Sequence, residues 1–125
     1  MLNGVRVDYS GAVATNPCGD NPFNEQPPNA IDNNVQTKML DFFKGSLVVD
    51  FGTQRTCNNY TWATANDENA RDPISWIFYG SNDVINWVQL SVVTNYATTT
   101  SRMTYLPSFG VDPSVSPNAL FGWVL

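Results

Sequence analysis

The chain has 125 residues, which is the length of one domain that can bury a core of its own. Hydrophobic residues make up 42% of it, and its net charge of −5 comes with only six basic residues and no histidine. This composition excludes a disordered chain, and the lack of clustered Lys and Arg speaks against binding to nucleic acid or to an anionic membrane. No apolar run reaches the length of a membrane span, so we expect a single domain over residues 1–125 without membrane insertion.

Short stretches in which apolar and polar residues alternate recur along the whole chain, as in half-buried strands. They predict strands at residues 5–9, 47–51, 60–64, 74–79, 87–90 with 92–93, 102–106 and 119–125. No segment has the 3.6-residue periodicity and the caps of a helix, so the chain is expected to be all-β. The four tryptophans lie on predicted strands and are expected in the core rather than on a binding surface, with Trp76 and Trp87 largely buried. The other two are Trp62 and Trp123.

The two cysteines, Cys18 and Cys57, leave the redox state of the chain open. A disulfide between them would stabilise the fold by roughly 3–4 kcal/mol in the loop-entropy model. Two unpaired thiols are an equally good interpretation, because the parity of only two cysteines is weak support for pairing.

The stretch 21–42 is rich in Asn, Asp and Pro and closes on apolar residues. Asn, Asp and Thr side chains hydrogen-bond their own backbone, so this stretch predicts an ordered loop rather than a helix or a strand. Asp32, the Thr37 hydroxyl and nearby carbonyls are also hard oxygen ligands of the kind that Ca²⁺ prefers. A purely structural turn without a metal is the alternative interpretation of the same residues.

Three motifs in this sequence resemble one known family. The segment Ala30-x-Asp32-Asn33-Asn34-x-x-Thr37-x-Met39 is similar to the A-x-D-G-N-x-x-T-x-W signature of the discoidin domain. Residues 47–52 and 80–87 resemble the family's apolar-x-D-L-G strand and S-x-D-G-x-x-W hairpin. The family includes the C domains of coagulation factors V and VIII and galactose-binding-like carbohydrate modules. Asn33 and Val84 replace the usual glycines, and Met39 replaces the usual tryptophan. Asn tolerates a positive φ best, whereas Val84 suggests a hairpin of a different shape.

The resemblance implies a discoidin-like jelly-roll β-sandwich of two antiparallel sheets. It also implies a structural Ca²⁺ bound by the Asp32 carboxylate, the Thr37 hydroxyl and the backbone carbonyls of Ala30, Asn34 and Thr37. The family's last strand, which carries a Glu that helps to hold the metal, has no counterpart after Leu125. We therefore expect a reduced calcium affinity or an empty site. Either the fold closes differently or the chain is a piece of a longer protein, with an exposed last strand that a neighbour could complete.

Catalysis has little support in the sequence. Without histidine, Ser/His/Asp and Cys/His arrangements are excluded, and there is no glycine-rich phosphate-binding loop. The remaining candidate is a glycosidase-like pair in which Asp67 or Glu68 acts with Asp72 as acid and base. Neighbouring carboxylates on a loop are far more often solvated or ion-paired than catalytic, so we predict that the protein is not an enzyme.

Two polar loops, residues 21–25 and 66–72, correspond by resemblance to the loops that carry the ligand in discoidin-like domains. Together they offer an aromatic ring and planar polar groups, the combination that sugars need. The candidate ligand-binding residues are Phe23, Asn24, Glu25, Asp67, Asn69, Arg71 and Asp72. Two structural alternatives stay open: Phe23 packed beneath its own loop, and Arg71 paired with Asp72 to pin the second loop.

These expectations point to a non-catalytic carbohydrate-binding or adhesion module with a glycan partner, located outside the cell or on the surface of a cell or particle. A single shallow site should bind weakly, with a Kd of roughly 0.1–1 mM. The alternative is a structural subunit or appended module of a fibre, capsid or cell-surface assembly. In that case the fold would serve self-assembly or contacts within a larger parent protein.

Overall fold

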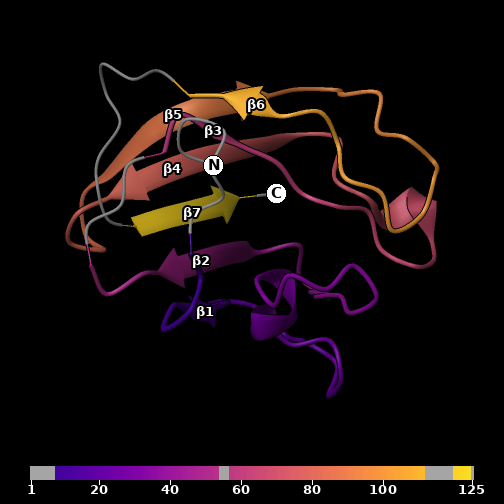
Figure 1. The fold of residues 1–125 in the computed structure, drawn as a ribbon, viewed down its shortest axis with the longest axis horizontal. Helices are drawn as coiled ribbons and strands as arrows, with labels where there is room; N and C mark the ends of the chain where they lie inside the picture. The colour runs from indigo at the N-terminus through magenta and orange to yellow at the C-terminus, as the bar shows by residue number, and fades with distance from the viewer. Residues whose placement is uncertain (1–7, 54–56, 112–119, 125) are drawn as a thin grey trace.

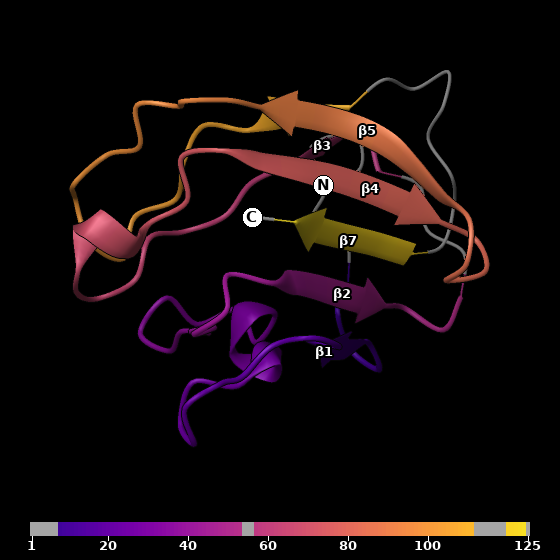
Figure 2. The same cartoon turned by 180° about the vertical axis from the view of Figure 1, so that it is seen from behind.

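The structure, a computed structural model, describes residues 8–53, 57–111 and 120–124, and its strands form two antiparallel sheets (Figures 1 and 2). The larger sheet has the strand order β1-β2-β7-β4-β5. Its strands are β1 (Val13–Thr15), β2 (Ser46–Asp50), β7 (Leu120–Val124), β4 (Trp76–Ser81) and β5 (Trp87–Val93). The smaller sheet pairs β3 (Asn59–Tyr60) with β6 (Phe109–Gly110). The predicted all-β class with two antiparallel sheets is therefore confirmed.

Successive side chains of β4 point to opposite faces of the larger sheet, and one of these faces is buried. In β4, Trp76 and Phe78 are each only 2% exposed, whereas Ile77 and Tyr79 on the opposite face are half-buried. Residue Val49 of β2 is buried on the core side as well. The expectation of a buried Trp76 is confirmed, while Trp87 in β5 is only half-buried.

Aromatic rings join the two sheets across the core. Tyr60 of β3 lies 4.2 Å from the ring of Phe78 in β4, and Phe109 of β6 meets Trp76 edge-on at 5.1 Å between ring centroids. The Trp76 Nε1 donates to the Tyr60 hydroxyl at 2.8 Å, and this hydroxyl also lies 2.9 Å from Ser91 Oγ of β5. Burial raises the pKa of Tyr60, so the phenol stays protonated and can serve this buried network.

Several predicted strand positions differ from the structure. The short strands β1 and β6 were not predicted, because three and two residues are too few to show an alternating pattern. Residues 102–106 contribute only one bridge, between Tyr105 and Ala63, rather than a strand. Residues 5–7 of the first predicted strand lie outside the described residues, and Asp8 and Tyr9 are not in a strand. The helical segments described are two 3-10 turns, η1 (Pro27–Ala30) and η2 (Asn69–Arg71), and no described helix is long and apolar enough to cross a membrane.

The last described strand, β7, does not lie at an edge of its sheet. It pairs with β2 on one side and with β4 on the other, so its backbone groups are already engaged (Figure 1). The expectation of an exposed last strand that a neighbour completes is therefore wrong. The edges of the larger sheet are β1 and β5 instead.

The two cysteines do not form a disulfide with each other. Cys18 is exposed, whereas Cys57 is buried and its Sγ donates to the carbonyl oxygen of Asn59 at 2.9 Å. Burial raises the pKa of the Cys57 thiol and keeps it in the neutral form.

Both residues that replace the glycines of the resembling motifs have a positive φ. Asn33 has φ 58° and Val84 has φ 63°, which is the left-handed region that glycine adopts freely. The hairpin at Val84 is held by Ser81 Oγ, which accepts from Val84 N at 3.0 Å, and by the Asp83 carboxylate, which accepts from Ile85 N and Asn86 N. These hydrogen bonds hold Val84 in the backbone conformation of a glycine, so the hairpin keeps the glycine shape at a cost in strain. Our expectation of a differently shaped hairpin gains no support from this geometry.

Replacing Val84 by Gly should therefore stabilise the domain. Relief of the left-handed strain exceeds the entropic cost of a new glycine, and the net gain should be about 0.5–1 kcal/mol in the free energy of unfolding. The side chain is 47% exposed, so little packing is lost. Chemical denaturation measures the effect, with Val92→Gly in β5 as the matched control. That control removes another exposed valine from an extended strand and should destabilise. A destabilised Val84→Gly variant would contradict the strain argument.

Candidate functional site

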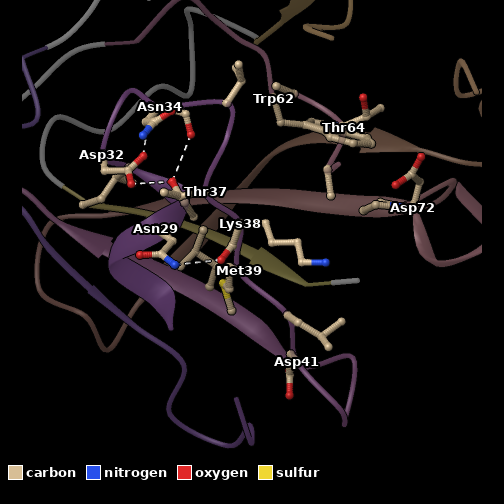
Figure 3. Close-up of a pocket in the computed structure, with 18 of the residues that line it drawn as sticks. Asn29, Asp32, Asn34, Thr37, Lys38, Met39, Asp41, Trp62, Thr64 and Asp72 are labelled. Atoms are coloured by element: carbon tan, nitrogen blue, oxygen red, sulfur yellow. Dashed lines mark hydrogen bonds between the residues drawn. The ribbon is translucent and has the colours of Figure 1, made fainter. Parts of the chain in front are cut away.

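A cavity of about 310 Å³ lies between two chain segments, residues 29–41 and residues 61–73 (Figure 3). In Figure 3, Asn29, Asp32, Asn34 and Thr37 stand on one side, and Trp62, Thr64 and Asp72 on the other. The volume falls in the range of small-molecule sites, which are usually concave, mostly apolar and fitted with a few polar groups. The cavity is therefore the first place to look for a ligand.

The wall formed by residues 29–41 is held by its own polar side chains. Asn29 Nδ2 donates to the carbonyl oxygens of Asn24 and Lys38, at 2.9 Å each, and so fixes the start of the segment to its end. The carboxylate of Asp32 accepts from Asn34 N at 2.9 Å and from the Thr37 hydroxyl. The hydrogen bonds agree with the prediction of an ordered loop, although the stretch 21–42 also contains the 3-10 turn η1.

The predicted calcium ligands are brought together in part. The Asp32 carboxylate, the Thr37 hydroxyl and the Asn34 carbonyl oxygen form one hydrogen-bonded cluster, with Thr37 Oγ1 3.0 Å from Asn34 O. This set of hard oxygens fits Ca²⁺ in kind, although it offers a single carboxylate. The described residues contain no group of three or more His, Cys, Asp or Glu side chains that could hold a metal. Ala30 lies beside the cluster on the lining of the cavity.

The opposite wall is pinned by an ion pair that the sequence did not predict. Asp72 pairs with the guanidinium of Arg102 through both of its oxygens, and Arg102 Nη1 also donates to the Asp67 carbonyl at 3.1 Å. The hydrogen bonds that Arg102 donates to the Asp72 carboxylate raise the pKa of Arg102. The alternative in which Arg71 pairs with Asp72 is therefore wrong. Within the described residues, the exposed Arg71 side chain makes no ion pair or hydrogen bond.

Lys38 ties the two predicted binding loops together. Its ammonium lies 3.0 Å from Glu25 Oε1 and 2.6 Å from Asp67 Oδ1, and in Figure 3 its side chain extends into the space between the two walls. The hydrogen bond with Asp67 raises the pKa of Lys38, and the same bond lowers the pKa of Asp67. The sequence analysis missed Lys38. Lys38 is the one basic residue in the stretch 21–42, and this was the available signal.

The seven candidate ligand-binding residues divide into two groups. Asp67, Arg71 and Asp72 line the cavity, whereas Phe23, Asn24, Glu25 and Asn69 are not among its described lining residues. Phe23 is 91% exposed, so the alternative in which it packs beneath its own loop is wrong. Glu25, Asp67 and Asp72 are already engaged in ion pairs.

The aromatic side chains that line the cavity belong to residues that the sequence analysis did not include among the ligand-binding candidates. Trp62 lines the cavity and stands edge-on to Trp76, with ring centroids 5.6 Å apart, so it belongs to the core and to the cavity at once. Its Nε1 is buried and finds no acceptor among the described residues. Tyr105 contributes a second, more exposed ring to the lining. The position of Trp62 immediately before a polar loop could have indicated this double role.

The carboxyl groups near the cavity include the candidates for acid–base catalysis. A general acid on a carboxyl side chain needs a raised pKa, as in glycosidases. Among the described Asp and Glu residues, each resolved pKa shift is downward, at Asp41, Asp67 and Asp83. The Asp67 carboxylate is bonded to Lys38 and the Asp72 carboxylate to Arg102, so two of the three candidate acid–base carboxylates, which also include Glu68, are held by cations.

No family model and no curated protein matches this chain. Among solved structures, it is similar to CpGH89CBM32-5 from Clostridium perfringens, solved in complex with GalNAc-β-1,3-galactose. The two share 15% sequence identity and superpose with a TM-score of 0.75, over 94% of this chain and 86% of the other. That structure is a galactose-binding-like jelly roll of the discoidin type. The fold of this chain is therefore discoidin-like. The resemblance seen in the three sequence motifs is confirmed at the level of the fold.

In this discoidin-like domain, the two neighbouring residues Arg71 and Asp72 should differ sharply in their effect on stability. Asp72→Ala should lower the melting temperature, because it leaves the half-buried Arg102 guanidinium without its carboxylate. Arg71→Ala should leave the melting temperature unchanged, because the side chain is exposed and unpaired within the described residues. Thermal unfolding followed by circular dichroism compares the two variants. Equal losses would show that both residues hold the loop.

Proposed function

We propose that this domain is a non-catalytic carbohydrate-binding module whose glycan site is the cavity between residues 29–41 and 61–73. The proposal rests on the lining of the cavity, which contains aromatic rings together with the guanidinium of Arg71. This guanidinium forms no ion pair or hydrogen bond with a described residue. The discoidin-like fold supports it, because the similar structure is a carbohydrate-binding domain in complex with a disaccharide.

The lining offers the two kinds of contact that a sugar requires. Trp62 and Tyr105 provide aromatic surface for the apolar C–H face of a pyranose ring. Arg71 provides planar N–H donors that can bind two hydroxyl oxygens side by side. The carboxylate of Asp67 keeps acceptor capacity beyond its bond with Lys38, because an ionised carboxylate has about four lone-pair sites. These groups face one cavity and together define the proposed site.

Phe23 and Asn24 lie on the neighbouring loop, which is joined to the cavity wall through Asn29 and Lys38. A ring that is 91% exposed has no part in the core and is free to stack on a sugar. We place Phe23 as a platform for a longer glycan that extends beyond the cavity. Its replacement by Ala should then reduce binding of an oligosaccharide by about 1 kcal/mol, while binding of a monosaccharide stays unchanged.

The proposed site predicts that Arg71 contributes to binding without contributing to folding. Arg71→Gln should weaken glycan binding about tenfold, because it removes charge-assisted hydrogen bonds worth about 1.5 kcal/mol. A glycan array with multivalent protein first identifies a ligand, and isothermal titration of the monovalent chain then measures its affinity. Lys44→Gln is the matched control, since it removes an exposed cation that does not line the cavity. The proposal fails if no glycan binds at millimolar concentration.

We also propose that Ca²⁺ binds the loop of residues 30–37 and stiffens one wall of the glycan site. The ligands would be the Asp32 carboxylate, the Thr37 hydroxyl and the backbone carbonyls of Ala30, Asn34 and Thr37. The hydrogen-bonded cluster of Asp32, Asn34 and Thr37 supports this assignment. With a single carboxylate in the set, the affinity should be modest.

Calcium binding can be tested on protein that has been stripped with a chelator. Titration with Ca²⁺ should release or absorb heat and raise the melting temperature by the amount that mass action requires. Asp32→Asn should abolish both effects, because it removes the one charged ligand while keeping its size. Asp20→Asn serves as control, since Asp20 lies outside the loop and the cavity lining. Absence of heat and of thermal stabilisation would mean that hydrogen bonds alone hold the loop.

A further inference from the structure

The backbone around Trp62 is held by the chain segment that runs beside it. The carbonyl oxygen of Trp62 accepts from Leu106 N at 3.0 Å, and two residues further on Thr64 N donates to the carbonyl oxygen of Thr104 at 2.9 Å. These two hydrogen bonds belong to an antiparallel pairing of residues 62–64 with residues 104–106. The indole of Trp62 therefore projects from a fixed backbone.

The polar side chains on either side of Trp62 find their acceptors within the chain. Thr61 Oγ1 donates to the carbonyl oxygen of Leu106 at 2.7 Å, and Thr64 Oγ1 donates to the carbonyl oxygen of Ser101 at 2.7 Å. Thr61, Trp62 and Thr64 all line the cavity. Only the indole of this group differs, because Trp62 Nε1 is buried and has no acceptor among the described residues.

A buried N–H without an acceptor has lost its hydrogen bonds to water and gained none in return, which makes such groups rare in folded proteins. The neighbouring Trp76 ring, edge-on at 5.6 Å, does not supply the acceptor, because an indole nitrogen only donates and an aromatic face accepts weakly. The Trp76 N–H is itself directed to Tyr60. The cavity that Trp62 lines is the space from which an acceptor can reach its Nε1.

From this arrangement we infer that Trp62 Nε1 is a hydrogen-bond donor of the glycan site and binds one hydroxyl oxygen of the sugar. This inference rests on the proposed glycan function and gives Trp62 a role beyond that of an aromatic surface. A site that contains a buried donor rejects a ligand without the matching acceptor, because the donor then stays without a partner. Trp62 would thus determine which hydroxyl group the sugar must carry.

The hydrogen bond can be observed at the indole of the unmodified protein. The chain has four tryptophans, and their indole N–H signals can be assigned in a nitrogen–proton correlation spectrum. Saturation with the methyl glycoside of galactose or glucose, whichever binds more tightly, should move the Trp62 indole proton downfield and slow its exchange with water. The signal of Trp87, which is not among the lining residues, should stay in place. A Trp62 proton that does not move at saturation overturns the inference.

A double-mutant cycle between protein and sugar identifies the hydroxyl group. Wild type and Trp62→Phe are titrated with the methyl glycoside and with its monodeoxy analogues. Loss of the hydroxyl that accepts from the indole should weaken binding about fivefold in wild type and hardly at all in Trp62→Phe, where the donor is gone. Trp87→Phe is the matched control, because it makes the same change at a half-buried position outside the lining, and should keep the wild-type pattern.

The outcomes separate this inference from the function on which it rests. If the sugar binds but each monodeoxy analogue loses the same factor in wild type and in folded Trp62→Phe, no hydroxyl group meets the indole. The inference is then overturned and the glycan function stands. If thermal unfolding shows that Trp62→Phe does not fold, the shift of the indole proton in wild type decides alone. If no sugar in the series or on the array binds at millimolar concentration, the glycan function falls and takes the inference with it.

Discussion

The indole of Trp76 is the point on which both the sandwich and its cavity depend. It is buried in β4, packs edge-on against Phe109 of the smaller sheet, and donates its N–H to Tyr60. The Tyr60 hydroxyl in turn lies within hydrogen-bond distance of Ser91 in β5, so one buried polar chain links three strands from two sheets. Because every member of that chain has a partner, the polar atoms add specificity to the core instead of a desolvation cost. The same indole lines the cavity, so the packing of the core also shapes the cavity.

The long loops of this domain obtain their order from side chains rather than from regular secondary structure. Partial burial of Asp41 favours its neutral form, but hydrogen bonds from the backbone N–H groups of Phe43, Asp20 and Gly45 outweigh this and lower its pKa. Asn29 and the pair of Asp72 with Arg102 act in the same manner on the two walls of the cavity. Each of these groups satisfies backbone or charged partners that would otherwise need water. Both walls of the cavity are therefore held in place by the chain's own polar groups.

The sequence predicted the parts of the fold that depend on local patterns. The alternation around Trp76 identified β4 and its buried face, and the Asp32 motif identified an ordered loop whose hydrogen bonds are present in the structure. Contacts between distant segments could not be predicted, because nothing local marks them. Arg102 lies thirty residues from Asp72, and Lys38 lies twenty-nine residues from Asp67. The pairing of Arg71 with its neighbour Asp72 was wrong for this reason. The exposed final strand was wrong because β7 pairs with the distant strands β2 and β4.

Arg71 differs from Lys38 and Arg102 because it forms no ion pair among the described residues. The sequence has only six basic residues against eleven acidic ones. Each basic residue therefore has several carboxylates in the chain with which it could form an ion pair. Lys38 and Arg102 both bind carboxylates and connect segments far apart in the chain. Arg71 lies close enough to Asp67 to help lower the pKa of that carboxyl, yet its guanidinium forms no bond with it. Its exposed side chain lines the same cavity as the rings of Trp62 and Tyr105. Among the described basic residues, Lys38 and Arg102 hold the loops, whereas Arg71 and Lys44 form no ion pair, and of these two only Arg71 lines the cavity.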